Sequence, residues 1–123
     1  MNRGEIYWAD LVPRSGAEQT GRRPVIVVSH DGFNRTPAWK SVIVVPISTS
    51  ASQGRRGPTV VELPGELPGE LPGGLTGLPK ANFAVCHQVT TLDRAKLGRK
   101  AGTLSSELLR QVGEAIKASI DLD

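Results

Sequence analysis

The chain has 123 residues, of which 38% are hydrophobic and 22% charged, with 15 basic and 12 acidic side chains. This composition predicts one globular domain over residues 1–123, large enough to bury a core without disulfides or metals. No apolar run is long enough to span a membrane, no signal peptide is recognisable, and the single cysteine, Cys86, excludes an internal disulfide. We therefore expect a cytoplasmic protein, with a net charge of +3 that mildly favours polyanions as partners.

The first half of the chain predicts strands joined by turn-rich loops, because β-branched runs alternate with Gly, Pro, Ser and Asn clusters. The predicted strands are residues 4–11, 25–28, 41–48 and 59–63. The predicted connections are residues 13–23, 30–40 and 49–58. Proline donates no backbone N–H, so Pro24 is expected to open its strand and Pro46 to mark a sheet edge or a bulge.

A Leu-Pro-Gly-Glu repeat occupies residues 63–75. A proline at every fourth position excludes a helix or a central strand, and each Pro-Gly pair suits the centre of a type II turn. We interpret the repeat as an expanded surface loop without chemistry rather than as a functional lid.

The second half predicts further β structure and a terminal helix. Residues 82–91 are β-rich and provide the last strand or two, and residues 93–97 form a short helical turn. From Leu104 to Ile120, apolar residues fall on one helical face, and Ser105 is a suitable N-cap. The sequence thus predicts a mainly β, α+β fold: a small SH3-like antiparallel barrel of about five strands with a C-terminal amphipathic helix.

Composition and motifs exclude several function classes. No group of His, Cys, Asp and Glu has metal-ligand spacing, and neither a phosphate-binding P-loop nor a nucleophile elbow is present. We therefore expect neither a metal nor another cofactor. Small barrels host many unrelated functions, so the function has to be argued from individual residues. The residues that can carry chemistry are Arg, Ser, Thr and His near the ends of predicted strands.

Several segments, in order and at matching separations, resemble the MazF/PemK-like toxins. The matching residues are 3–11, Pro13, Gly16, Glu18-Gln19, Gly21, Arg23-Pro24-Val25, 44–48 and 86–93, together with the 104–122 helix. The resemblance covers nearly the whole chain except the repeat. It implies a toxin of a type II toxin–antitoxin system that cleaves single-stranded RNA sequence-specifically, without a metal, through attack by the RNA's own 2′-hydroxyl. It also implies a homodimer with an RNA groove between protomers and a cognate antitoxin that blocks the groove.

That reaction needs a base for the 2′-hydroxyl proton, donors for the extra charge on phosphorus and an acid for the leaving oxygen. Arg23 matches the family's catalytic arginine, and its planar guanidinium suits bidentate binding of phosphate. Since guanidinium pKa values exceed about 12, we assign Arg23 charge stabilisation first and acid catalysis second.

Ser48 and His87 are the other catalytic candidates. Ser48 aligns with a position where the family usually carries a catalytic threonine, and it retains the hydroxyl. Its neighbour Thr49 competes for the role, because strand alternation lets only one of the two face a groove; alternatively, both are ordinary strand-end hydroxyls. His87 occupies a position where some relatives carry an acidic base, and histidine shuttles protons near neutral pH. Those relatives have an arginine where this chain has Val85, and a structural role for His87 remains the competing interpretation.

The remaining candidates are assigned to substrate binding. They are Glu18, Gln19, Arg22, Thr49, Arg55, Arg56 and Gln88. Glu18 is also expected to orient an arginine, and solvated surface charge is the alternative for Arg22, Arg55 and Arg56. His30 is expected to have no chemical role, Asp31 to form a turn, and Cys86 to be a small buried hydrophobe.

Two other functions are open to this fold. The first is a toxin that binds DNA gyrase through a C-terminal segment ending in aromatic residues. The chain ends in Ile120-Asp121-Leu122-Asp123, which argues against that function. The second is a non-catalytic barrel that binds RNA or protein, and it predicts that removing the charge of Arg23 leaves function intact.

Overall fold

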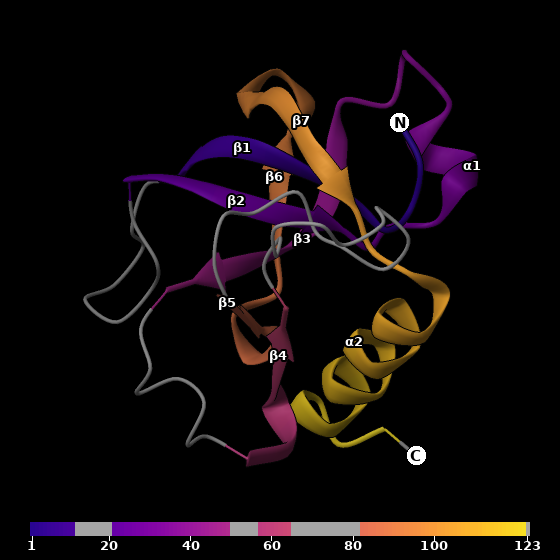
Figure 1. The fold of residues 1–123 in the computed structure, drawn as a ribbon. Helices are drawn as coiled ribbons and strands as arrows, with labels where there is room; N and C mark the ends of the chain where they lie inside the picture. The colour runs from indigo at the N-terminus through magenta and orange to yellow at the C-terminus, as the bar shows by residue number, and fades with distance from the viewer. Residues whose placement is uncertain (12–20, 50–56, 65–81, 123) are drawn as a thin grey trace.

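The computed structural model describes residues 1–11, 21–49, 57–64 and 82–122. Seven strands are found among them: β1 (Glu5–Leu11), β2 (Gly21–Val27), β3 (Ser41–Ser48), β4 (Val60–Leu63), β5 (Asn82–Val85), β6 (Thr90–Asp93) and β7 (Leu97–Thr103). The α-helices are α1 (Asp31–Asn34) and α2 (Ser106–Ser119), and the 3₁₀-helices are η2 (Gly57–Thr59), η3 (Cys86–Gln88) and η4 (Arg94–Lys96). The mainly β fold with a C-terminal helix, predicted from the sequence, is confirmed (Figure 1).

The long strand β3 organises the sheet because it has different partners along its length. On one side, residues 44–46 in its middle pair with β2, as in Ile26↔Val45. On its other side, the first half (41–44) pairs with β6 and the last two residues (47–48) pair with β5. All these pairs are antiparallel, and the order is β4-β5-β3-β2-β1-β7 with β6 beside β3. The strands curl into a barrel-like shape, but the described sheet stays open between β4 and β7.

Two hydrophobic clusters follow from strand alternation, since successive side chains point to opposite faces. One face of β3 places Val42 and Val44 with Ala9 and Val25, closed by partly buried Leu92 and Leu97. This smaller cluster is built by residues of β1, β2, β3, β6 and β7. The opposite face belongs to a larger cluster beneath α2. That cluster contains Ile6, Ile26, Val45, Ile47, Val61, Leu63, Ala84, Cys86, Leu104, Val112 and Ala115.

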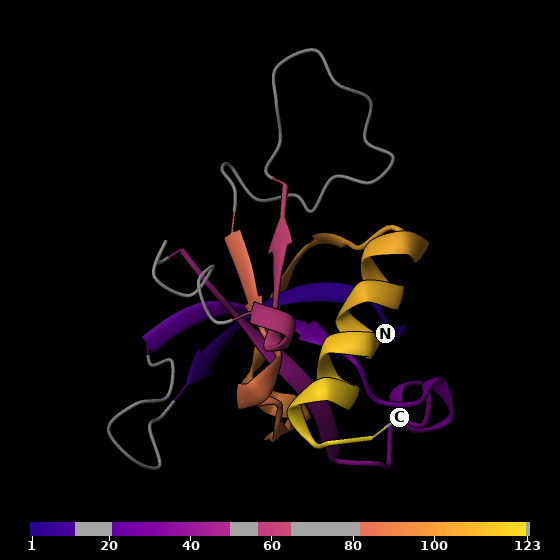
Figure 2. The ribbon, with the colours of Figure 1, turned by 90° about the horizontal axis from the view of Figure 1, so that it is seen from below.

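Helix α2 covers β4, η2 and η3 (Figure 2). It begins as predicted at the N-cap Ser105, whose hydroxyl accepts a hydrogen bond from the Leu108 amide at 3.2 Å. Such a cap stabilises a helix by about 1 kcal/mol. Val112 and Ala115 point into the core, whereas Glu107 and Arg110 form an exposed ion pair. Among the described residues, no helix combines the length and the apolar character needed to cross a membrane.

The prolines and the strand count differ from the sequence expectations. Strand β2 does not open at Pro24 but begins at Gly21, because β1 pairs with it as far as Leu11↔Gly21. Pro46 lies inside β3, between its last pair with β6 and its first pair with β5, so a missing N–H costs little there. Strand β7 was not predicted, since Leu97–Thr103 has few apolar residues and is held mainly by pairing with β1.

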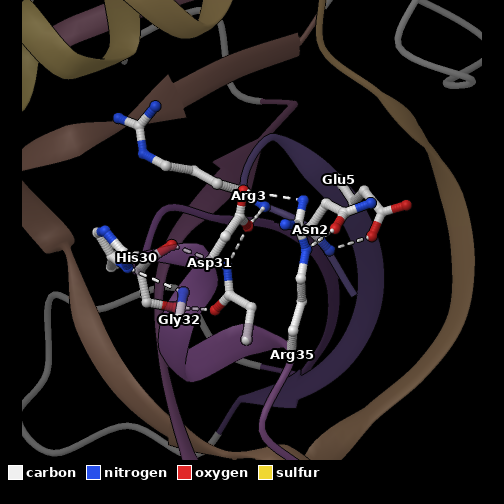
Figure 3. A network of polar contacts seen from close by, with 9 residues as sticks. Asn2, Arg3, Glu5, His30, Asp31, Gly32 and Arg35 are labelled. Atoms are coloured by element: carbon white, nitrogen blue, oxygen red, sulfur yellow. Dashed lines mark hydrogen bonds and ion pairs between the residues drawn. The ribbon is translucent and has the colours of Figure 1, made fainter.

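The connection after β2 is more ordered than a plain loop. His30 is the N-cap of α1 and accepts a hydrogen bond from the Gly32 amide at 2.8 Å through Nδ1. Asp31 accepts a bond from the backbone amide of Arg3, and this bond lowers the pKa of the Asp31 carboxyl. Arg35 bonds both Asp31 and Asn2 (Figure 3). His30 and Asp31 therefore have structural roles that tie the start of the chain to α1.

Candidate active site

Arg23 and Ser48 come from neighbouring strands and lie opposite each other. Strands β2 and β3 are antiparallel, with Val25↔Pro46 as their last pair toward this end. Continuing the same register by two residues places Arg23 across from Ser48. Opposite residues of an antiparallel pair project to the same face with Cβ atoms about 4.5–5.5 Å apart. The start of β2 and the end of β3 lie on the side of the molecule away from α2 (Figures 1 and 2).

The hydroxyl-bearing candidates differ sharply in exposure. Ser48 is only 3% exposed and ends β3, where it pairs with Phe83 of β5. Thr49, the next residue, is exposed. Arg23 is partly exposed and pairs on its other side with Ala9. The cation of Arg23 thus borders the solvent, whereas the hydroxyl of Ser48 is buried.

Arg22 precedes Arg23, and its side chain is exposed to the solvent. Strand alternation sends its side chain to the opposite face of β2 from Arg23. A Cβ placed on Gly98 of β7 would lie 3.7 Å from Nη2 of Arg22, so the guanidinium reaches across β1 to β7. Two adjacent arginines consequently carry positive charge onto both faces of this end of the sheet.

We expected His87 to lie on a strand, but it lies on the 3₁₀-helix η3. Strand β5 ends at Val85 because the chain has to turn there before it pairs with the first half of β3 as β6. The His87 ring is exposed, and its Nδ1 is 3.1 Å from the hydroxyl of Thr59, which ends η2. Thr59 was not among the residues predicted from the sequence. It lies beside His87 because β4, which follows η2, pairs with β5, which precedes η3.

His87 and Ser48 belong to different parts of the sheet. Ser48 pairs with Phe83 near the beginning of β5, and His87 follows the opposite end of that strand. His87 is four residues beyond Phe83, and the chain leaves the strand at Val85 to form η3 before it reaches His87. Proton transfer requires contact at about 3 Å or through one water. Register thus aligns Arg23 with Ser48, whereas His87 lies on a different turn, beside Thr59.

The turn that carries His87 and Gln88 is firmly anchored. Cys86, the first residue of η3, is fully buried in the larger cluster, and burial raises the pKa of its thiol to about 12. The thiol is therefore neutral and unreactive at physiological pH, which agrees with its predicted role as a small hydrophobe. Helix α2 packs on both η2 and η3 and so supports Thr59 and His87 together. Gln88 is partly buried.

Some predicted site residues lie outside the described residues. These are Glu18, Gln19, Arg55 and Arg56, together with all but the start of the Leu-Pro-Gly-Glu repeat. Within the part of the chain that the structure describes, no three His, Cys, Asp or Glu residues come together in a group that could hold a metal ion.

Comparison with known proteins identifies the family. The model for PemK-like, MazF-like toxins of type II toxin–antitoxin systems matches residues 2–120. Endoribonuclease EndoA of Bacillus subtilis (strain 168) is 31% identical over 122 residues, which cover 99% of this chain and 96% of that protein. MazF of Deinococcus radiodurans superposes with a TM-score of 0.74 at 21% identity, covering 99% and 97% of the two chains. A mycobacterial endoribonuclease, solved in complex with its cognate antitoxin, gives 0.71 at 24% identity, covering 100% and 97%. The chain thus belongs to the family of PemK-like, MazF-like toxins.

Proposed function

We propose that this toxin is an endoribonuclease that cleaves single-stranded RNA without a metal, through attack of the 2′-hydroxyl on the adjacent phosphate. The observation that carries the proposal is the antiparallel register of β2 and β3, which aligns Arg23 with Ser48 when it is continued two residues beyond Val25↔Pro46. The name of the Bacillus subtilis relative, an endoribonuclease matched over nearly its full length, supports the same activity.

The two side chains divide the chemistry. Arg23 binds the scissile phosphate and stabilises the second negative charge that develops as the 2′-oxygen attacks phosphorus. Ser48 donates a hydrogen bond to a phosphate oxygen and fixes the phosphate against the strand ends. The attack forms a bond from the 2′-oxygen to phosphorus and breaks the bond to the 5′-oxygen, so the products are a 2′,3′-cyclic phosphate and a 5′-hydroxyl. The 2′-hydroxyl proton leaves to a base, and the 5′-oxygen takes a proton.

His87 has a separate role in this proposal. Its position on η3, four residues beyond the strand partner of Ser48, favours a contact with RNA over proton transfer at the scissile phosphate. We assign the exposed ring, held by Thr59, and the neighbouring Gln88 to contacts with RNA beyond the scissile phosphate. Thr49 and Arg22, both exposed beside the Arg23–Ser48 pair, are assigned to the RNA on either side of it.

The partners expected for the toxin are a cognate antitoxin and a second copy of the chain. The mycobacterial relative was solved with its antitoxin, which supports the first. Exposed apolar side chains support the second: Phe33 and Trp39 stack at 4.5 Å and are 42% and 48% exposed. Light scattering of the purified chain tests the homodimer, and a monomeric mass at micromolar concentration contradicts it.

The activity is tested by incubating the purified chain with long single-stranded RNAs of several sequences in excess chelator. We expect fragments that end in 2′,3′-cyclic phosphate and their loss in Arg23→Ala. Intact RNA contradicts the ribonuclease proposal, and 3′-hydroxyl ends contradict the attack by the 2′-hydroxyl. A gyrase supercoiling assay in parallel examines the alternative toxin mechanism, for which we expect no inhibition.

A further inference from the structure

The edge strand β7 is irregular opposite the end of β1 that adjoins Arg23. Ala9 pairs with Leu97 and Tyr7 pairs with Lys100, so Trp8 alone faces the two residues Gly98 and Arg99. This is a β-bulge, and bulges at sheet edges change the direction of side chains and are frequent beside functional sites. Here the bulge places an arginine on the outermost strand of the described sheet.

The bulge adjoins the guanidinium of Arg22. A Cβ built on Gly98 would meet Nη2 of Arg22 at 3.7 Å, which is ordinary van der Waals contact. The Arg22 guanidinium therefore lies against the β7 backbone, next in sequence to Arg99. Ala9 connects the two sides, because it pairs with Arg23 on β2 and with Leu97 on β7. Arg22 thus carries positive charge across β1 to the sheet edge, on the face of β2 opposite to Arg23.

The cations at this edge are not bonded to other side chains or carbonyls of the residues that the structure describes. Arg22, Lys96 and Arg99 are all exposed, and within the described ranges no hydrogen bond or ion pair of their side chains is found. Asp10 is the acidic residue paired with Arg22 in the sheet, yet no ion pair joins them. Like charges held close together repel each other, and a polyanion relieves that repulsion while it releases bound counterions.

We propose that Arg22, Lys96 and Arg99, which we call the basic edge, bind phosphates of the RNA that flank the cleavage site. The inference rests on the proposed ribonuclease function and adds a binding surface on β7 to it. The basic edge reads no bases: exposed Lys and Arg contacts to phosphate position a nucleic acid without sequence information. RNA bound at Arg23 therefore passes around this end of the sheet to the opposite face, where Arg22 leads toward Lys96 and Arg99.

The test measures binding of a fluorescent, mixed-sequence, 2′-O-methylated single-stranded RNA, which lacks the attacking hydroxyl, as a function of salt. The variants are Lys96→Ser, Arg99→Ser and the double variant. Lys40→Ser is the matched control, because Lys40 is an exposed cation at the opposite end of β3 and outside the basic edge. Cleavage of ordinary RNA by the wild-type chain is recorded in parallel.

We expect the double variant to bind about tenfold more weakly at low salt. The slope of log affinity against log salt should fall by about 1.4, since each single-strand phosphate contact contributes about 0.7. Lys40→Ser should match the wild type within twofold. If the wild type cleaves RNA but the double variant binds with unchanged affinity and slope, the basic edge is refuted. An equal loss in Lys40→Ser also refutes it, because the effect then reflects net charge. A wild type that does not cleave RNA refutes the ribonuclease proposal instead.

Discussion

The two ends of the β2–β3 pair use arginine in opposite ways. At the α1 end, three arginines are engaged with the protein itself. Arg94 donates to the carbonyls of Phe33, Asn34, Thr36 and Trp39, and Arg35 bonds Asn2 and Asp31. Arg3 donates from Nε to the Val28 carbonyl. These side chains fix the connection between β2 and β3 and the start of the chain.

At the opposite end, arginines are presented to the solvent. The side chains of Arg22 and Arg99 bond no group of the described residues, and Arg23 is partly exposed and aligned with Ser48 by the β2–β3 register. Composition and net charge describe the chain as a whole, so they cannot distinguish arginines that bond the protein from arginines that face the solvent. The difference lies in carbonyl geometry: turns near α1 expose acceptors that a guanidinium can bind, whereas paired strands have already used theirs.

The largest effect is expected at the solvent-facing end. Arg23→Ala should lower the cleavage rate by about 10²–10³-fold, the usual cost of removing one donor that stabilises charge in the transition state. The free energy of unfolding should change by less than about 1 kcal/mol. Cleavage kinetics and urea unfolding check both, with Arg23→Lys as the variant that retains charge but loses bidentate geometry. A rate within threefold of the wild type would remove Arg23 from the chemistry.

Arg94 at the α1 end should show the reverse pattern. Arg94→Met keeps the aliphatic length but leaves carbonyls of the α1 connection without their donor, which should cost about 2–3 kcal/mol of unfolding free energy. Cleavage at 25 °C, where the variant is still folded, should stay within threefold of the wild type. Urea unfolding and the same cleavage assay measure this. An activity loss as large as that of Arg23→Ala would abolish the distinction between the two ends.

A substitution of His87 tests whether the groups that carry out the reaction all lie with Arg23 and Ser48. Because it lies away from the Arg23–Ser48 pair, His87→Ala should reduce the rate by less than tenfold, whereas a main acid or base supplies about 10²–10⁴-fold. Thr59→Val removes the hydroxyl bonded to Nδ1 and should reproduce part of that small loss. The reduction should be in KM, with the pH profile of kcat unchanged. A hundredfold loss with an altered pH profile would return His87 to the catalytic group.

The smallest effect concerns Glu5, another internally paired charge. Burial alone raises the pKa of its carboxyl, but the bond and charge of Lys100, with bonds from the Asn2 amide and the Tyr7 hydroxyl, outweigh burial, so the pKa lies below its ordinary 4.5. A lowered folded-state pKa stabilises the fold above pH 4.5, and this contribution disappears as the pH falls through the folded pKa. Glu5→Gln should therefore show a smaller fall in melting temperature between pH 6 and pH 3 than the wild type, by a few degrees. Identical falls would show that Glu5 contributes nothing to acid sensitivity.

Periodicity was sufficient to predict much of the fold. The buried runs in β2 and β3, the helical turn at η4 and the capped helix α2 all follow from local patterns. Strand β7 could not be predicted in this way, because its polar residues 98–100 are held by pairing with β1 and not by burial. The 3₁₀-helix η3 was also missed, since the turn is required by the exchange of partners along β3, which is a property of topology.

The candidate site was partly predictable for the same reason. Arg23 and Ser48 could be named from the family resemblance, and antiparallel register then explains their proximity. The separation of His87 and its bond to Thr59 depend on how β4 and β5 pair, which no local pattern encodes. The basic edge needed the bulge at Gly98 and Arg99, which is visible only once β1 and β7 are aligned.

The contrast between the two ends can be tested in one measurement on the unmodified protein. Nitrogen-15 NMR of arginine Nε–H groups reports each side chain during titration with 2′-O-methylated single-stranded RNA. We predict that the signals of Arg22, Arg23 and Arg99 shift together, while those of Arg3, Arg35 and Arg94 stay in place. Shifts confined to Arg3, Arg35 and Arg94, or no shift at Arg23, would contradict the account.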